Sequence, residues 1–208
     1  MSAEIKKSPL QVTVLLTAGR IPTRLLTEVH DVVRQYGLIL YLTTAQNLRL
    51  LGMREEDLPE IQDRLNIKGA TIKTMGMFPV PRVCVGEDGC NLGLVDTEEL
   101  SKKIVARFGR KMVKPKFKIA IAACPASCAN ALSTDIGIVA TRAGYDIYVG
   151  GKGGTRPAIG RRIVRKADDM KVLEVIEELV AFHQEKTGEK QRFHKMLEEP
   201  EFPFPKTV

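Results

Sequence analysis

Four cysteines in two close pairs are the side chains of this sequence best suited to chemistry. Five residues separate Cys84 from Cys90, and three separate Cys124 from Cys128. The second pair directly follows an apolar run, which is typical of a loop that leaves a buried strand. Four thiolates that converge from two loops are the ligand set of a cubane iron–sulfur cluster, because each iron takes one soft sulfur ligand from the protein. The cysteine pattern therefore predicts such a cluster.

Three other interpretations of the cysteines stay open at this point. They could be unrelated buried thiols, or two disulfides, which are rare in reducing compartments. A structural zinc site is the third, but paired zinc ligands usually have about two to four residues between them. The wider gap between Cys84 and Cys90 disfavours zinc. Pro125 follows Cys124, and a Cys-Pro step is a frequent companion of cluster ligands.

The net charge of +7 is concentrated in two segments that flank the second cysteine pair. Residues 101–118 contain eight lysines and arginines, residues 152–166 contain six, and neither segment contains an acid. A solvated basic face and a nucleic-acid surface are the alternatives, although the chain has no Trp and no familiar nucleic-acid motif. Basic segments beside metal ligands favour a polyanionic cofactor or a small oxyanion substrate.

Length and composition are those of an ordinary globular protein. The chain has 208 residues, of which 44% are hydrophobic and 27% charged. No apolar run approaches the ~20 residues of a membrane helix. The first ten residues lack the apolar core of a signal peptide, so we expect a cytoplasmic protein without a membrane partner.

The fold class predicted from hydrophobic periodicity is α+β, with a ferredoxin-like βαββαβ domain followed by an α/β domain that holds the cysteines. The expected domains are residues 1–75, residues 76–190 and a C-terminal tail of residues 191–208. In the first domain we expect strands at 11–17, 38–44, 47–51 and 70–75, and helices at 22–36 and 57–65.

The second domain is expected to begin in the proline-rich run 76–82. Asp96 followed by Glu99 predicts a capped helix that ends near Phe108. A buried strand at 117–122 leads to Cys124. We expect further strands at 135–140 and 145–151, a Gly- and Arg-rich loop at 152–162, an amphipathic helix at 169–186 and an extended, peripheral end at 198–208.

Several of these segments resemble a known family. CVGEDGCNLGL and ACPASCANALSTDIGIVA are similar to the two cluster-binding segments of the sirohaem-containing sulfite and nitrite reductases. KPKFKIAI and YDIYVGGKGG resemble the motifs on either side of the second segment. The resemblance covers most of the chain. In size, the chain resembles the small single-repeat sulfite reductases of assimilatory type.

The resemblance implies that a 4Fe–4S cluster is held by the four cysteines and that Cys128 also ligates the sirohaem iron. It places Arg82, Lys116 and Lys118 around the substrate oxyanion, as cations that stabilise charge and donate protons. Because neighbouring residues of a strand point to opposite sides, Lys116 and Lys118 are expected to face one pocket and Phe117 the core.

The resemblance also gives the basic segments a role, since sirohaem carries several carboxylates. Arginine grips a carboxylate bidentately, and glycines let the backbone approach the ring closely. The expected cofactor-binding residues are Arg110, Lys114, Gly150, Gly151, Lys152, Arg156, Arg161 and Arg162.

The implied activity is the six-electron reduction of sulfite to sulfide, with electrons from an external ferredoxin-like carrier. Ala45, however, stands where the family has an arginine that reaches the substrate. A non-catalytic electron-transfer or sirohaem protein is therefore one alternative, and nitrite reduction to ammonia by the same centre is the other. Larger members carry two copies of the unit, so the single copy here predicts a twofold homodimer, or else a monomer whose tail covers the ring.

Overall fold

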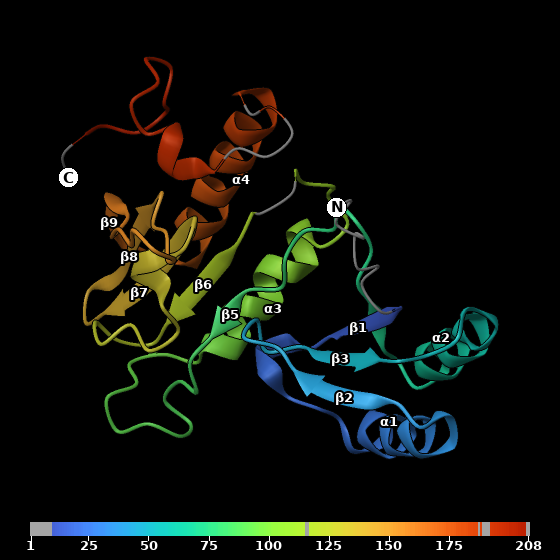
Figure 1. Ribbon diagram of the computed structural model, residues 1–208. Coiled ribbons are helices and arrows are strands. Elements are labelled where there is room, and N and C mark those ends of the chain that lie inside the picture. The colour runs from blue at the N-terminus through green and yellow to red at the C-terminus, as the bar shows by residue number, and fades with distance from the viewer. Residues whose placement is uncertain (1–9, 115–116, 187, 189–191, 207–208) are drawn as a thin grey trace. The chain divides into compact units, whose positions relative to one another are not determined.

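Two compact units make up the chain, residues Met1–Thr74 and Met75–Val208. The computed structural model describes residues 10–114, 117–186, 188 and 192–206 (Figure 1). Each unit contains its own β-sheet. Within the described residues, no helix combines the length and the apolar character that crossing a membrane requires.

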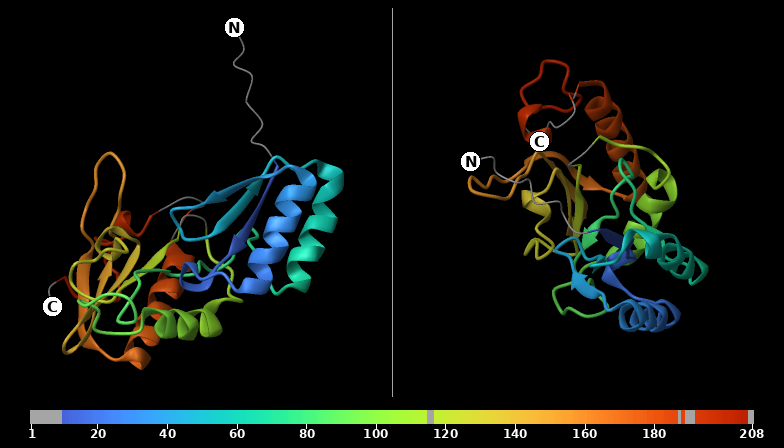
Figure 2. Two further views of the ribbon diagram at one scale, coloured as in Figure 1. Left: turned by 90° about the horizontal axis from the view of Figure 1, so that it is seen from below. Right: turned by 45° about the vertical axis from the view of Figure 1, so that its right-hand side comes forward.

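The first unit has the predicted βαββαβ order. Its antiparallel sheet runs β2-β3-β1-β4, and α1 and α2 lie side by side on one face of it (Figure 2). The elements are β1 (Gln11–Leu15), α1 (Thr23–Tyr36), β2 (Ile39–Leu42), β3 (Leu48–Leu51), α2 (Leu58–Ile67) and β4 (Thr71–Ile72), with short 3-10 turns at Thr17–Gly19 and Glu55–Asp57. The ferredoxin-like prediction is confirmed.

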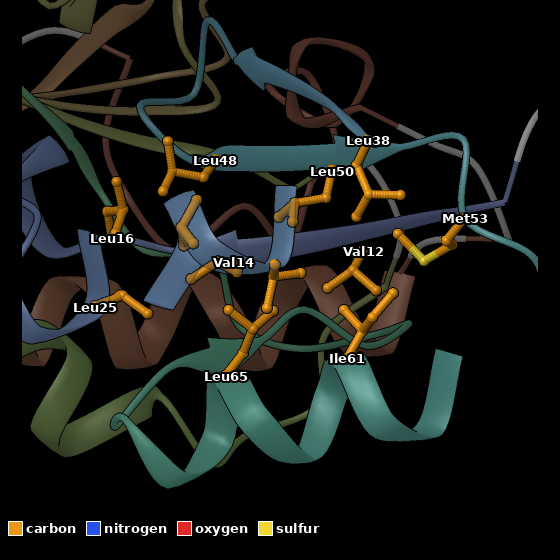
Figure 3. Close-up of a cluster of buried hydrophobic side chains, with 12 residues drawn as sticks. Val12, Val14, Leu16, Leu25, Leu38, Leu48, Leu50, Met53, Ile61 and Leu65 are labelled. Atoms are coloured by element: carbon orange, nitrogen blue, oxygen red, sulfur yellow. The ribbon is translucent and has the colours of Figure 1, made fainter. Parts of the chain in front are cut away.

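Alternating apolar residues form the core of this unit between the sheet and the two helices (Figure 3). Val12 and Val14 of β1 point to the same face as Leu48 and Leu50 of β3, because residues two apart in a strand share a side. Gly37 ends α1 in the left-handed conformation, at a φ of 62°, where glycine carries no steric penalty. The turn that follows directs the chain back along the sheet.

The second unit is built on a five-stranded mixed sheet of order β5-β6-β7-β8-β9. The strands β5, β6 and β7 pair in parallel, and β8 and β9 continue antiparallel. The elements are β5 (Arg82–Val83), α3 (Thr97–Phe108), β6 (Ile119–Ala122), β7 (Ile136–Thr141), β8 (Gly144–Val149), β9 (Arg161–Ala167) and α4 (Asp169–Lys186), with 3-10 turns η3 (Ala131–Ser133) and η4 (Phe193–Lys195). All four residues of β6 are buried, as a central parallel strand requires.

Two helices of this unit follow their sequence signals. The carboxylate of Asp96 accepts hydrogen bonds from the backbone N–H groups of Glu98 and Glu99, at 2.8 and 3.1 Å, and so caps α3 as predicted. The helix α4 begins at Asp169 and ends at Lys186, which are the predicted bounds.

Two strands were not predicted, and the C-terminal end differs from its prediction. β5 has only two residues and follows Pro81, so its pattern is too short to detect. β9 contains four basic residues, which obscure its alternation. Residues 198–206 contain turns and bends rather than being extended throughout as predicted, and the ring of Phe202 packs edge-on against Phe182, with centroids 5.4 Å apart.

Candidate functional site

Two neighbouring parallel strands deliver the first cysteine of each pair. Cys84 directly follows β5 and Cys124 lies two residues beyond β6. The backbone N–H of Cys84 donates to the carbonyl oxygen of Ile121 across 3.3 Å, which continues the parallel ladder. Because parallel strands end at the same edge of a sheet, both thiols lie at the C-terminal edge of the β5–β6 pair.

The second cysteine of each pair lies in an exposed loop. Cys90 follows a turn at Gly86–Gly89, and Cys128 follows a turn in which Ser127 has a positive φ of 55°. The Cys90 loop returns to the sheet, where the N–H of Leu94 donates to the carbonyl oxygen of Ala123 across 3.0 Å. This bond fixes the end of the first cysteine loop directly beside the start of the second.

One cavity of about 500 Å³ joins the two cysteine loops. It is lined by Asn91, Leu92, Leu94, Cys124, Pro125, Ala126, Thr141 and Arg142. The lining comes from both loops and from the β7–β8 turn. The segments predicted to share a cluster are therefore neighbours in space.

All four cysteines are free thiols, so the disulfide interpretation has no support here. Among the described residues, no three side chains of Cys, His, Asp or Glu lie close enough together to share a metal ion. The donor set itself fits an iron–sulfur cluster, because four thiols without histidine partners match the ligands of a cubane. Cys124 lines the cavity, and Cys84 follows the strand adjacent to the one that leads to Cys124.

A second cavity of about 500 Å³ gathers basic side chains. We call it the oxyanion pocket, and its lining is Arg82, Lys118, Asn130, Ser133, Thr134, Asp135, Gly153, Gly154 and Arg192. The structure thus brings together two of the three predicted substrate residues, Arg82 and Lys118. The third, Lys116, lies outside the described residues.

The guanidinium of Arg82 is held rigidly at the pocket wall. Its Nε donates to the carbonyl oxygen of Ala129 across 2.7 Å, and its Nη2 donates to Oγ1 of Thr134 across 3.0 Å. Burial lowers the pKa of Arg82 from its ordinary value, although an arginine stays charged in a protein. Since both partners belong to the segment after Cys128, Arg82 connects β5 to the second cysteine loop.

The strand alternation predicted for the Lys-Phe-Lys run is observed in its described part. Phe117 is buried and its ring packs against Phe193, with centroids 5.8 Å apart. Lys118 is exposed and lines the oxyanion pocket. The lysine therefore faces the pocket while its aromatic neighbour anchors the chain in the core.

The predicted cofactor-binding residues are not gathered into one site. Arg110 is exposed at the turn after α3, and Lys114 donates to the carbonyl oxygen of Gln184 across 2.6 Å. Lys152 and the exposed Arg156 lie in the β8–β9 loop. Arg161, the first residue of β9, contacts the C-terminal segment.

The last two residues of that set make contacts within the chain. Arg161 donates to the carbonyl oxygen of Leu197 across 2.8 Å and lies over the ring of Phe202. Arg162 donates to the buried carboxylate of Asp146 across 3.3 Å. These two arginines therefore stabilise the fold of the second unit.

The predicted glycines Gly150 and Gly151 are explained by close packing within the chain. A Cβ atom on Gly150, which has a φ of 79°, would lie 2.7 Å from a methyl carbon of Leu197. A Cβ atom on Gly151 would lie 2.4 Å from the carbonyl oxygen of Leu132. Both positions require glycine because of neighbours in this protein.

Two charged residues of the oxyanion pocket, Asp135 and Arg192, were not predicted from the sequence. Asp135 is an acid at the start of a buried strand and is only 2% exposed. Arg192 lies in the segment that was expected to be a tail. An acid directly before the apolar run of β7 is a detectable signal, whereas nothing local in the sequence marks Arg192.

The comparisons with known proteins agree with these observations. Residues 80–200 match the model of the nitrite and sulphite reductase 4Fe-4S domain, and residues 6–66 match the nitrite/sulfite reductase ferredoxin-like half domain. The first match alone covers more than half of the chain and includes all four cysteines.

The similar curated proteins include both nitrite reductases and sulfite reductases. A nitrite reductase [NAD(P)H] of Bacillus subtilis is 30% identical over 83% of this chain, which spans only 22% of that protein. An assimilatory-type sulfite reductase of Nitratidesulfovibrio vulgaris is 28% identical over 95% of this chain and 94% of its own length. The present chain thus has the size of the second protein and about a fifth of the length of the first.

Solved structures show the same fold at low sequence identity. The Mycobacterium tuberculosis NirA protein superposes with a TM-score of 0.71 at 21% identity, over 91% of this chain and 38% of that one. Dissimilatory sulfite reductase I superposes with a TM-score of 0.75 at 14% identity, over 88% and 65%. With the domain matches, the paired cysteines and the basic pocket, these likenesses establish that the chain belongs to the nitrite and sulfite reductase family.

Proposed function

We propose that this chain reduces sulfite to sulfide with a 4Fe–4S cluster and sirohaem, using electrons from an external carrier. The observation that carries the proposal is the position of two free-thiol pairs at the ends of adjacent strands. Arg82 connects this cysteine region to a pocket that contains three basic side chains. The proposed cluster ligands and the anion pocket are thereby connected by one half-buried guanidinium.

Each cysteine has a binding role in this proposal. Cys84, Cys90, Cys124 and Cys128 hold the cluster, and Cys128 also ligates the sirohaem iron. When bound, the two groups supply a path for electrons and an open iron position at which the oxyanion is reduced. The chain contributes the placement of these ligands through β5, β6 and their loops.

The pocket side chains orient the oxyanion and supply protons. Arg82 is fixed by two hydrogen bonds, so it presents a preorganised positive charge without reorganisation. Lys118 is exposed to the pocket and can donate a proton as each oxygen leaves as water. Lys116 has the same proposed role.

The carboxylates of sirohaem require basic partners, and the predicted basic residues of the β8–β9 loop are the best candidates. Lys152 and Arg156 lie in the β8–β9 loop, next to Gly153 and Gly154 of the oxyanion pocket. Arg110 and Lys114 lie at the end of α3 and are assigned more distant contacts. Gly150 and Gly151 serve by shaping the start of the loop.

The similarity to the assimilatory-type sulfite reductase, which extends over 94% of that protein, supports sulfite as the substrate. The chain covers nearly the whole assimilatory-type sulfite reductase but only a fraction of the nitrite reductases. Nitrite is the second candidate, because the nitrite reductase of Bacillus subtilis is 30% identical. Ala45 lies in the exposed β2–β3 turn, at the position where the family has an arginine. Because that arginine is replaced, a non-catalytic electron-transfer protein is the other alternative.

The partners and location of the protein are part of the same proposal. A cytoplasmic, reducing environment suits thiolate ligands. We propose a ferredoxin-like electron donor and a twofold homodimer. Light scattering of the loaded protein tests the assembly, because a mass near that of one 23.1 kDa chain at all concentrations contradicts the dimer.

Anaerobic purification followed by a turnover assay tests the function. The loaded protein is expected to contain about four cluster irons and four labile sulfides per chain, and to show the absorption spectrum of sirohaem. With a strong artificial reductant it should release sulfide from sulfite faster than ammonia from nitrite. Colourless protein that contains only zinc overturns the cofactor assignment, and a loaded protein without turnover favours the electron-transfer alternative.

A further inference from the structure

Arg192 reaches the oxyanion pocket from a part of the chain far from the cysteines in sequence. It directly precedes η4, whose Phe193 is fully buried and packs in a tilted arrangement against the ring of His183, with centroids 4.8 Å apart. Met196 is also buried. These two anchors hold the C-terminal segment against the unit and place the guanidinium of Arg192 at the pocket wall.

Inside the pocket, Arg192 faces a buried carboxylate. Its Nη1 lies 3.4 Å from Oδ2 of Asp135, a residue that is 2% exposed. This separation is longer than the ~2.7–2.9 Å of a strong charge-assisted hydrogen bond. Oδ2 of Asp135 is buried without a hydrogen-bond donor. One oxygen of the carboxylate is thus left without a hydrogen bond, although a cation lies near it, while backbone hydrogen bonds from Lys118 and Asp135 favour the charged form.

We propose that Asp135 and Arg192 form a proton-coupled switch in the oxyanion pocket. An incoming oxyanion replaces the carboxylate of Asp135 as the partner of Arg192, and the carboxylate takes up a proton from solvent. An O–H bond forms on Asp135 and no electron is transferred. Protonation of Asp135 makes the net charge of the pocket more positive when the anion binds. The proton on Asp135 then lies beside the bound anion.

The charges around Asp135 support this exchange. The described charged side chains that line the pocket with it are Arg82 from β5, Lys118 at the start of β6 and Arg192 before η4. Burial raises the pKa of Asp135 to about 6, while Arg192 and Lys118 oppose the rise. Once the oxyanion neutralises these cations, their opposition weakens and the protonated carboxyl is favoured further.

The inference deepens the proposed function and rests on it only for the identity of the anion. Two sources share the required chemistry, namely a small inorganic oxyanion and a carboxylate of the bound tetrapyrrole. Both present oxygen atoms that a guanidinium can grip in the place of Asp135. The experiment therefore needs one arm for each source.

Sulfate is the probe for the first arm, because it is not protonated near neutral pH and is not reduced without an electron donor. Calorimetric titration of the protein as purified, in buffers of different ionisation enthalpy, counts the protons taken up on binding. We expect close to one proton at pH 7.5, and an affinity that falls about tenfold per pH unit above pH 6. Asp135→Asn should abolish both the uptake and the pH dependence.

Arg192→Gln should weaken sulfate binding roughly tenfold or more, the effect of losing one charge-assisted contact, and Arg192→Lys should recover part of it. The matched control is Arg165→Gln, which removes an exposed arginine of β9 outside the pocket. Thermal melting followed by circular dichroism verifies that each variant is folded. Sulfate binding without proton uptake, or with the same uptake in Asp135→Asn, overturns the switch.

Sirohaem retention is the second arm. If a tetrapyrrole carboxylate occupies the pocket, sulfate does not bind to the loaded protein, and retention of sirohaem should fall between pH 6 and pH 8. Asp135→Asn should then retain sirohaem equally at both pH values. If Asp135→Asn changes neither sulfate binding nor sirohaem retention, the proposal is contradicted. Because the sulfate arm requires no metal centre, its result is independent of whether the proposed reductase activity is correct.

Discussion

The backbone N–H of Ala123 donates to the Sγ atom of Cys84 across 3.1 Å, so the residue before the second cysteine pair contacts the sulfur of the first. This bond crosses from β6 to β5 and ties the two cysteine segments together through the ligand atom itself. Hydrogen bonds to cluster sulfurs are among the features that set the reduction potential of iron–sulfur clusters. With Cys84 as a ligand, as proposed, this hydrogen bond would affect the electronic properties of the cluster as well as its attachment.

Replacement of single cysteines should separate their roles. Cys84→Ala, Cys90→Ala and Cys124→Ala are each expected to lower iron and labile sulfide per chain by more than half. Cys128→Ala should in addition remove the electronic coupling between cluster and haem, because the shared sulfur is lost. Elemental analysis and low-temperature electron paramagnetic resonance measure the two effects. Full iron content in Cys84→Ala would contradict its role as a ligand.

Arg82→Lys tests whether a fixed guanidinium is needed rather than a positive charge alone. Lysine keeps the charge but cannot make the paired contacts to Ala129 and Thr134. We expect turnover of sulfite to fall roughly 100-fold, by analogy with the loss of one preorganised donor. Steady-state kinetics on fully loaded protein gives the value. Arg165→Lys on β9 is the control, and equal activity of the two variants would refute the role of Arg82.

Gly150 and Gly153, two glycines between β8 and β9, allow a paired test of how close packing affects stability. Gly150→Ala places a Cβ atom 2.7 Å from Leu197 at a φ of 79°, whereas nothing lies within 4 Å of a Cβ atom on Gly153. We expect Gly150→Ala to lower the free energy of unfolding by about 1–3 kcal/mol, and Gly153→Ala to leave it nearly unchanged. Denaturant titration measures both. Similar stabilities would mean that the Leu197 contact relaxes at no cost.

The buried carboxyl of Asp135 should make stability depend on pH in a defined direction. Its pKa in the folded protein is about 6, above its ordinary value of 3.8, so folding favours the protonated form. The stabilisation is complete below about pH 4 and is lost as the pH rises through 6. Relative to Asp135→Asn, the free energy of unfolding should fall by up to about 3 kcal/mol between pH 4 and pH 7. A constant difference over this range would contradict the raised pKa.

Much of the fold could be predicted because its signals are local. The periodicity of α4 and the cap of α3 at Asp96 specify those helices without help from the rest of the chain. The cysteine pairs were detectable for the same reason, since each pair is contained in one loop. β9 was missed because an edge strand needs fewer apolar residues, and its charges resemble those of a loop.

The site was only partly predictable because its members come from distant segments. Arg82 was assigned by resemblance, but its anchoring by Ala129 and Thr134 depends on how two loops meet. Arg161 and Arg162 were predicted to bind a cofactor, and their contacts with Leu197 and Asp146 could not be predicted from the sequence. Charge along a sequence shows where cations are available, but only tertiary structure shows which of them are already engaged.

The segment around η4 makes the two candidate sites depend on different parts of the chain. Since Arg192 lines the oxyanion pocket and Phe193 is buried in the core, that pocket includes residues far beyond the last cysteine in sequence. A variant truncated at Lys186 would contain every cysteine, together with Arg82 and Lys118, but would lack the guanidinium that lies 3.4 Å from Asp135. Such a variant would keep all the proposed sulfur ligands and lose one of the three basic side chains that line the pocket.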